Sequence, residues 1–175
     1  MSLHLFAGPT ETEKVLEFVN AGNLRQFADQ AFIAELLCWV RFDKREALAS
    51  LDGLYSSCTG NPRVPRWLGE QVPRHLTPQG QADSDAKKLR SSAGLVAIAS
   101  DRENKASWVR TGQVYQRLAL RMTSMGVKSA ILNQPNEVPQ VRRQFQSALG
   151  FGAALPQLLV RFGFAEAMPT SLPFS

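Results

Sequence analysis

The most regular pattern of apolar and polar positions in the chain runs from Trp108 to Met125. Its apolar residues are three or four positions apart, so they share one face of a helix. Arg117 and Arg121 fall on the opposite face, and cations late in a helix interact favourably with its negative end. Gly126 is well placed for the left-handed residue that commonly ends a helix. The pattern therefore predicts a long helix that stops at Gly126.

Two segments follow this helix, one apolar and one polar. The apolar run from Val127 to Leu132 predicts a short buried connector. The residues from Asn133 to Asn136 are three polar residues and a proline. They predict a loop in the connection between two rigid helices. Loops held in this way often carry functional side chains. An ordinary turn after a core helix is the simpler interpretation of the same residues.

Apolar segments elsewhere predict the remaining strands and helices. Short apolar runs predict strands at 2–6, 93–100 and 156–162, and the second is typical of a central strand that is covered on both faces. Helical spacing predicts four further helices, at about 10–22, 23–41, 81–90 and 137–149. Connections as long as these imply one mixed or antiparallel sheet with helices packed around it, which is an α+β fold.

The first two of these helices have recognisable ends. Thr10 and Glu13 have the spacing of a capping box. Gly22 is a candidate helix stop, and Asn23 is a candidate cap for the next helix. The stretch from Phe32 to Val40 is apolar nearly all round the helix, so we expect it deep in the core or in a subunit interface.

The segment from about 52 to 79 is rich in proline and glycine and predicts a long loop. Loops of this length inside a compact domain are usually functional or disordered, and its aromatic residues favour an ordered one. We expect a lid or an arm over a neighbouring surface. His75 is most simply a surface histidine. Cys58 and the two histidines lack the spacing of zinc ligands, so no metal site is expected.

Composition and charge restrict the classes of function. The 175 residues, 44% of them hydrophobic and 20% charged, suffice for one domain with a substantial core. No apolar run approaches the roughly 18 residues that span a bilayer, and no signal peptide is recognisable. Two cysteines are too few for a disulfide framework and fit a reducing cytoplasm. The net charge of +5 comes from scattered basic residues, so we expect neither a nucleic-acid nor a membrane partner.

Common nucleotide-binding and catalytic motifs, such as a Walker loop, GxGxxG, GxSxG and HExxH, are absent from the sequence. Several segments in order instead resemble the C-terminal half of a nitroreductase-superfamily flavoprotein, in particular the Acg-family FMN-binding oxidoreductases. These segments are SSAGLVAIASD, WVRTGQVYQRLALRMTSMGVKSAILNQPNE, RRQFQSALG and LPQLLVRFGF. The segments ELLCWVRFDKREA and LDGLYSSCTGNPRVPRWLG are similar to the Acg group as well.

The resemblance implies a nitroreductase-like α+β fold that binds FMN at a two-fold interface, with NAD(P)H as electron donor. In the Acg-like group, the two halves of one long chain take the places of two nitroreductase subunits. The chain is similar to the second half, as a single domain over 1–175 without the family's N-terminal lobe. The resemblance therefore implies a homodimer or pairing with such a lobe. It also implies a basic residue for the FMN phosphate just beyond Ser175.

The resemblance also implies which residues meet the cofactor. In the family, the turn after the long helix lies against the isoalloxazine ring of the flavin. The corresponding residues here are Ser129, Asn133, Gln134 and Pro135. Asn133 and Gln134 are neutral, so they offer hydrogen bonds that tune a reduced flavin without adding charge. Hydride transfer depends on stacking and orientation, so no catalytic acid or base is expected.

Three functions are compatible with this resemblance. The first is an FMN-dependent NAD(P)H oxidoreductase that reduces small nitro or quinone-type acceptors. The second is a flavin-binding or flavin-sequestering protein without turnover, in which the loop at 52–79 closes the pocket for the acceptor. The third is a non-catalytic helical interaction domain. Bound flavin separates the third function from the others, and NADPH turnover with a nitroaromatic acceptor separates the first from the second.

Overall fold

The structure is a computed structural model that describes residues 1–59 and 77–166. Most of the lid-like loop, including His75, lies outside the described residues. Within the described part, no helix is long and apolar enough to cross a membrane. The same residues contain no group of three histidine, cysteine or acidic side chains that could hold a metal ion.

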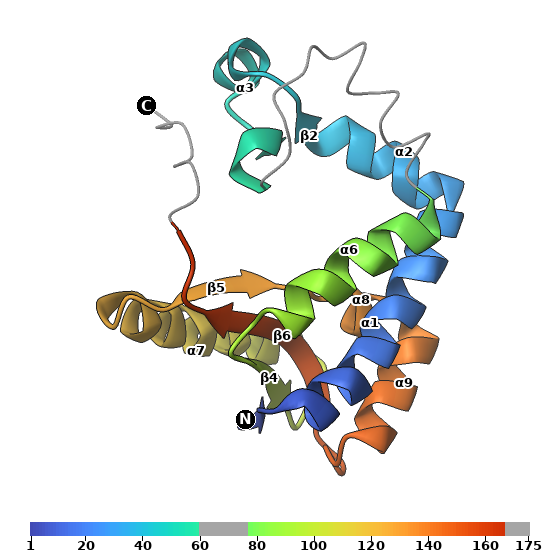
Figure 1. Ribbon diagram of the computed structural model, residues 1–175, viewed down its shortest axis with the longest axis vertical. Helices are drawn as coiled ribbons and strands as arrows, with labels where there is room; N and C mark the ends of the chain where they lie inside the picture. The colour runs from blue at the N-terminus through green and yellow to red at the C-terminus, as the bar shows by residue number, and fades with distance from the viewer. Residues whose placement is uncertain (60–76, 167–175) are drawn as a thin grey trace.

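A four-stranded antiparallel sheet forms the centre of the molecule, in the order β1-β4-β6-β5 (Figure 1). Its strands are β1 (Ser2–Phe6), β4 (Gly94–Ser100), β5 (Lys128–Ile131) and β6 (Leu155–Gly163). The register pairs Leu3 with Ile98 and Ile131 with Val160. All three predicted strands are confirmed, and the sheet is antiparallel rather than mixed.

Helices cover both faces of this sheet. Three of them lie on one face: α1 (Pro9–Ala28), α6 (Pro78–Arg90) and α9 (Pro139–Ala148). The main core lies between them and the sheet, and its larger members are Val15, Leu16, Val19, Leu89, Leu95, Phe145 and Leu159. The long helix α7 (Lys105–Ser124) packs on the other face. Strand β4 is buried at every position, as its apolar run predicts for a central strand.

An arm continues from the end of α1 and stands away from the sheet (Figure 1). It consists of α2 (Gln30–Trp39), β2 (Val40–Arg41), α3 (Lys44–Ser50), β3 (Leu54–Tyr55) and a 3-10 helix (Ser56–Thr59). No residue of α2 is buried, although its sequence is apolar nearly all round. The expectation of a core position for this stretch is therefore wrong. A subunit interface, the alternative, stays a prediction.

Helix α1 runs past both residues that the sequence suggested as a boundary. Gly22 lies inside the helix, where a Cβ would come within 2.8 Å of the backbone carbon of Gln134. Asn23 is fully buried, and its side chain bonds across to α6 instead of capping a helix. The next helix, α2, is capped by Asp29. Both boundary predictions are wrong because close helix contacts and buried polar contacts use the same residue types as helix ends.

The capping box predicted from Thr10 and Glu13 is also wrong. Helix α1 begins at Pro9, and proline is favoured at the first helical position. Glu11, rather than Glu13, reaches back and accepts a hydrogen bond from the backbone N–H of Ala7 at 2.7 Å. The N-cap is therefore Gly8, two residues before the Thr10 that the capping-box spacing suggests.

The region after α7 agrees with the sequence at Gly126 and differs beyond it. Gly126 has a φ of +74° and ends the helix as predicted. The apolar run that follows forms β5, an edge strand that leaves Ile131 50% exposed, so the expectation of a buried connector is wrong. The expected polar loop is a single helical turn, α8 (Gln134–Glu137), in which Pro135 is fully buried.

Candidate functional site

Asn133 precedes α8, and its two oxygens hold this turn in place. Oδ1 of Asn133 accepts a hydrogen bond from the backbone N–H of Leu159 on β6 at 3.2 Å. The same oxygen accepts from Nδ2 of Asn136 at 2.7 Å. The backbone carbonyl of Asn133 accepts from the N–H groups of Asn136 and Glu137. The side-chain nitrogen of Asn133 remains available to another partner, since no acceptor for it occurs in the described part of the chain.

Gln134 begins α8, and its side chain points into the molecule. Its Nε2 atom donates to Oδ2 of Asp85 on α6 at 3.1 Å. Its Oε1 atom is buried and has no hydrogen-bond partner among the described residues. From another side, α1 comes so close at Gly22 that a Cβ there would lie 2.8 Å from Gln134. Two helices, α6 and α1, therefore hold the first residue of the turn.

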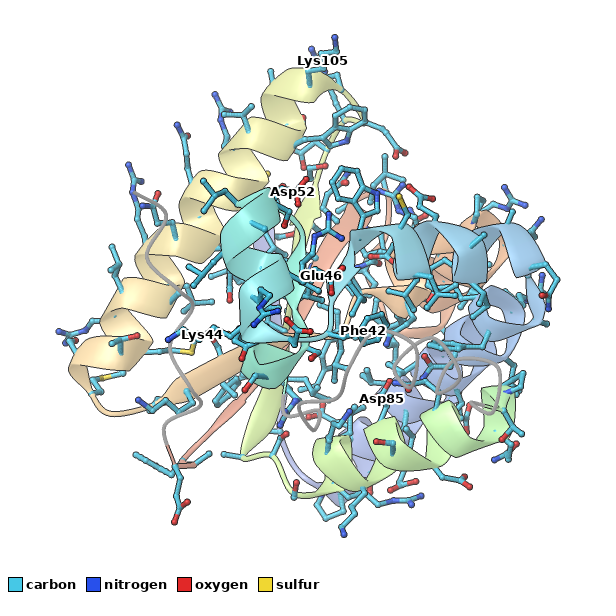
Figure 2. The ribbon with its side chains drawn as sticks, turned by 90° about the horizontal axis from the view of Figure 1, so that it is seen from above. Phe42, Lys44, Glu46, Asp52, Asp85 and Lys105 are labelled. Atoms are coloured by element: carbon cyan, nitrogen blue, oxygen red, sulfur yellow. The ribbon has the colours of Figure 1, made fainter. Side chains whose placement is uncertain are left out.

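Asp85 is a buried carboxylate, 1% exposed, where α6 meets α1 and α8 (Figure 2). Four side chains donate to it: Asn23 at 3.0 Å, Gln81 at 3.1 Å, Gln134 at 3.1 Å and Lys88 at 2.9 Å. A buried carboxylate needs such donors, because removing a charge from water is costly unless the charge is paired and hydrogen-bonded. We call these five residues the Asp85 junction.

The sequence analysis missed the Asp85 junction, although a signal for it is present. Asn23 follows the buried Val19 by four positions, and Asp85 precedes the buried Leu89 by four. Each polar residue therefore lies on the buried side of its helix. A buried polar residue requires a partner across the helix interface. The spacing identifies two residues in need of partners, but it does not identify them as each other's partner.

The other two predicted cofactor contacts have different surroundings. Pro135 is fully buried in α8 and has no N–H group to donate. Ser129 lies on β5, and its hydroxyl is 3.4 Å from that of Tyr115 on α7, the helix that covers the opposite face of the sheet from α1 and α6. The structure thus brings Asn133, Gln134 and Pro135 together in one turn and places Ser129 apart from them.

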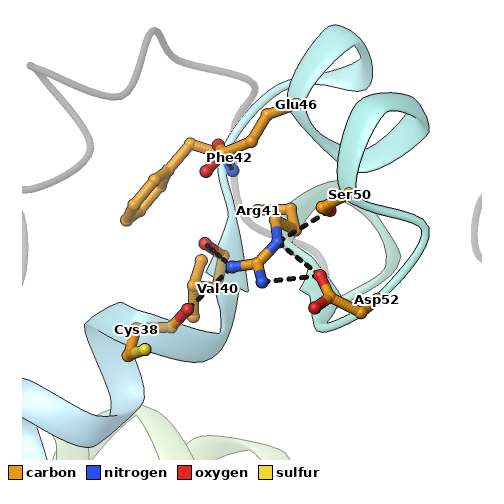
Figure 3. A network of polar contacts seen from close by, with 7 residues as sticks. All are labelled: Cys38, Val40, Arg41, Phe42, Glu46, Ser50 and Asp52. Atoms are coloured by element: carbon orange, nitrogen blue, oxygen red, sulfur yellow. Dashed lines mark hydrogen bonds and ion pairs between the residues drawn. The ribbon is translucent and has the colours of Figure 1, made fainter.

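A second polar network holds the arm together, and it centres on Arg41 (Figure 3). The guanidinium of Arg41, a residue only 9% exposed, donates to Oδ1 of Asp52 at 2.6 Å from Nη2 and at 3.0 Å from Nε. It also donates to the hydroxyl of Ser50 and to the carbonyl of Cys38. The hydrogen bond from Arg41, with a smaller one from Ser50, lowers the pKa of Asp52 below its ordinary value. The network joins α2 to the segment after α3 and has a structural role.

An open cleft lies beside α8, where the end of α1 and the start of α2 meet α9. Its volume is about 430 Å³, and it is lined by Arg25, Gln26, Asp29, Phe32, Glu137, Val138, Pro139 and Gln140. Gln26 donates to Glu137 across it at 2.7 Å. Ligand pockets usually bury most of the ligand surface. A cleft this open does not enclose a flat aromatic ring unless another chain or segment closes it.

Comparison with known sequences gives distant relatives of much greater length. No protein-family model matches the chain. Two curated relatives, from two strains of Mycobacterium tuberculosis, are each 23% identical to it over 155 residues. Both carry the name of an NAD(P)H nitroreductase, an activity that has been inferred for them. The alignment covers 86% of this chain and 42% of each relative, so the chain spans less than half the length of the curated relatives it matches.

Comparison with solved structures gives the fold. A nitroreductase-like family protein from Bacillus cereus superimposes with a TM-score of 0.51 and 10% identity, over 98% of this chain and 66% of that protein. The FMN-dependent nitroreductase NfnB from Mycobacterium smegmatis, solved in complex with NADPH, has a TM-score of 0.54 and 14% identity, over 97% of this chain and 74% of that protein. The chain therefore has a nitroreductase-like α+β fold, as the sequence predicted.

Proposed function

We propose that the chain is the C-terminal lobe of a cytoplasmic, FMN-dependent NAD(P)H oxidoreductase of the nitroreductase type, with nitro or quinone-type acceptors. The observation that carries this proposal is the fold, which follows an FMN-dependent nitroreductase over 97% of the chain. The names of the longer relatives support the same activity. Because the chain covers 42% of their length, we assign the activity to an assembly of this lobe with a second one.

The α8 turn offers donor groups of the kind that a flavin ring requires. Asn133 and Gln134 precede the first hydrogen-bonded turn of α8, so the helix itself provides no acceptor for their backbone N–H groups. The side-chain nitrogen of Asn133 is a third donor. Neutral donors suit N5 of the oxidised ring and the carbonyl oxygens of its pyrimidine edge, which are acceptors. The side chain of Gln134 already donates to Asp85, so we assign Gln134 a backbone contact.

Bound FMN would supply the redox chemistry: it would take a hydride from NAD(P)H and pass two electrons to the acceptor, which would take up protons from solvent. The residues of this chain provide orientation and neutral hydrogen bonds. The turn is suited to this task because β6 holds it through Asn133 and α6 holds it through Gln134. The proposal requires no side-chain acid or base, since the rate of hydride transfer depends on how the two rings are placed.

One flank of α7 carries exposed apolar side chains, and we propose that it pairs with a second copy or with an N-terminal lobe. Trp108, Val109 and Leu120 are 50%, 63% and 65% exposed and fall on one side of the helix with Gly112. A Cβ built at Gly112 would have no atom of the described residues within 4 Å, so a partner has room to approach the backbone there. Exposed apolar patches of this kind are typical of interaction surfaces.

Turnover tests the proposed function. The assembled protein is given FMN and NADPH, and oxidation of NADPH is followed with and without a nitroaromatic or a quinone. We expect oxidation that depends on the acceptor. Retention of FMN without acceptor-dependent oxidation would favour the flavin-sequestering function instead. A protein that binds no FMN at all would contradict both flavin functions and leave a helical interaction domain.

A further inference from the structure

The Asp85 junction fixes how α8 is placed on the core. Asp85 belongs to α6, and through Gln134 it holds the first residue of α8. Gly22 of α1 meets the backbone of the same residue from another side. Both helices belong to the main core, with Val19 and Leu89 fully buried. Two rigid helices therefore hold the turn at Gln134, and β6 holds it at Asn133.

The hydrogen bonds of the Asp85 junction orient the side chain of Gln134 more than they stabilise the fold. Three side-chain amides, from α1, α6 and α8, converge on Oδ2 of Asp85. Burying a carboxylate is costly, and apolar residues in place of a buried polar group are often as stable or more stable. Oδ1 of Asn23 and Oε1 of Gln134 are also buried without a partner in the described part of the chain. Hydrogen bonds are directional, so this arrangement specifies one placement of Gln134, which apolar contacts would not do.

We propose that Asp85 is a positioning residue for the flavin contact at α8 and that it acts through Gln134; this inference rests on the proposed function. By accepting from Nε2, Asp85 draws the Gln134 side chain into the core. The backbone N–H groups of Asn133 and Gln134 are then held in one orientation relative to the sheet. Orientation matters for the transfer, because a misplacement of about 1 Å caused by a distant change can slow a reaction roughly a hundredfold.

The chain offers a matched control for this role. Gln81 and Gln134 each donate from Nε2 to Oδ2 of Asp85 at 3.1 Å, but only Gln134 belongs to α8. The experiment is a double-mutant cycle of Asp85→Leu and Gln134→Met in the assembled protein, with Gln81→Met as the control. Flavin fluorescence titration measures the affinity for FMN. Hydrogen exchange at Asn136 and Glu137, whose N–H groups bond to Asn133, measures how firmly α8 is held.

The expected results follow from the hydrogen bond between Gln134 and Asp85, which joins α8 to α6. Asp85→Leu should weaken FMN binding roughly tenfold, within the range of coupling for residues of one hydrogen-bond network, and should speed exchange in α8. The double variant should bind FMN no more weakly than Gln134→Met alone, because both substitutions remove the same link. Gln81→Met should bind FMN as the wild type does.

Other results would overturn the role of Asp85. Losses in FMN affinity that add up in the double variant would contradict a shared link, and so would an Asp85→Leu variant of lower stability with wild-type affinity. Either result would leave the proposed function standing. If Asp85→Leu does not fold, Asp85→Asn takes its place in the single and the double variant. Equal affinities of the double variant and Gln134→Met then support the role, and a further loss contradicts it. A wild-type assembly that binds no FMN would overturn the proposed function, and this inference with it.

Discussion

Two glycines inside helices have different roles in this chain. Gly22 lets α1 touch the backbone of Gln134, with no room for a Cβ. Gly112 lies on the exposed side of α7, where a Cβ would meet no atom within 4 Å. A glycine in a helix interior costs about 0.5–1 kcal/mol relative to alanine. The contact with α8 therefore accounts for Gly22, whereas packing among the described residues does not account for Gly112.

Alanine at these two positions should have opposite effects on stability. Gly22→Ala places a methyl group against backbone atoms of α8, and overpacking of this kind costs about 1–3 kcal/mol. Gly112→Ala should stabilise the monomer by about 0.5–1 kcal/mol, because only helix propensity changes. Urea unfolding of both variants at low protein concentration gives the two midpoints. A midpoint for Gly22→Ala at or above that of the wild type would show that α1 and α8 are not in contact.

At the level of single residues, the sequence predicted roles where the backbone alone decides them. Gly126 was found because the helical pattern stops there and a left-handed residue must follow. Gly22 and Asn23 were taken for helix ends because their role depends on Gln134 and Asp85, which are far away in the sequence. Asn133 was singled out by resemblance, but its bond to the N–H of Leu159 was not foreseen.

The arm shows how a short element depends on its polar contacts. Helix α3 has few buried residues, and its N-terminus is held by Asp43, which accepts from the N–H of Glu46 at 2.9 Å. Glu46 in turn accepts from the N–H of Phe42 at 3.0 Å (Figure 3). Arg41 and Asp52 then close the segment that follows. Polar contacts rather than a core of its own therefore stabilise much of the arm.

The pair of Arg41 and Asp52 should make the arm sensitive to acid. The pKa of Asp52 is lower in the folded chain than its ordinary value of 3.8, so the pair stabilises the fold fully above that value. This contribution is lost as the pH falls through the folded pKa, because the carboxyl becomes protonated. We expect urea midpoints of the wild type to fall toward those of Asp52→Asn as the pH drops from about 7 to about 2. Parallel pH profiles for the two proteins would contradict the assignment of this ion pair.

Whole elements were predictable where burial shapes the local sequence. The continuous apolar run of β4 and the helical period of α7 identified both elements. Edge strand β5 was not identified as a strand, since its exposure follows from pairing with β6 on one side only. Helix α3 was missed, although Asp43 and Glu46 have the spacing of a capping box. Its seven residues are too few for a clear apolar period.

At the scale of the whole molecule, apolar side chains are exposed that no other described residue covers. Leu3 and Leu5 on β1 are 56% and 62% exposed, and the flank of α7 with Trp108 and Leu120 is similarly open. The nitroreductase-like fold was predictable because several segments appear in the family's order. The position of the arm was not predictable from the sequence, because the apolar character of α2 suits a core and an interface equally well.

We expect the isolated chain to self-associate through the flank of α7. Leu120→Glu places a charge on this flank and should weaken association, because burying a carboxylate in an apolar interface is costly. Leu24→Glu makes the same change on α1, where Leu24 is 42% exposed, and should leave association unchanged. Light scattering over a range of protein concentrations compares the three proteins. A wild-type chain that remains monomeric at micromolar concentration would contradict the expectation.

The central claim is that the α8 turn contacts FMN, and a flavin fluorescence titration tests it most directly. The wild-type assembly is compared with a variant that carries Asn133→Ala and Gln134→Ala. The control carries Gln144→Ala and Ser147→Ala, two exposed positions on α9. Because the side chains of Asn133 and Gln134 also hold the turn, all three proteins are first shown to be folded at the temperature of the titration.

The proposal predicts that the α8 variant binds FMN about five- to a hundredfold more weakly. The variant loses the side-chain donor of Asn133 and the hydrogen bond to Asp85 that orients the backbone N–H of Gln134, and each such bond is worth roughly 0.5–1.5 kcal/mol. The α9 control should bind FMN as the wild type does. Equal dissociation constants for FMN in all three folded proteins would contradict the assignment of α8 as the flavin contact.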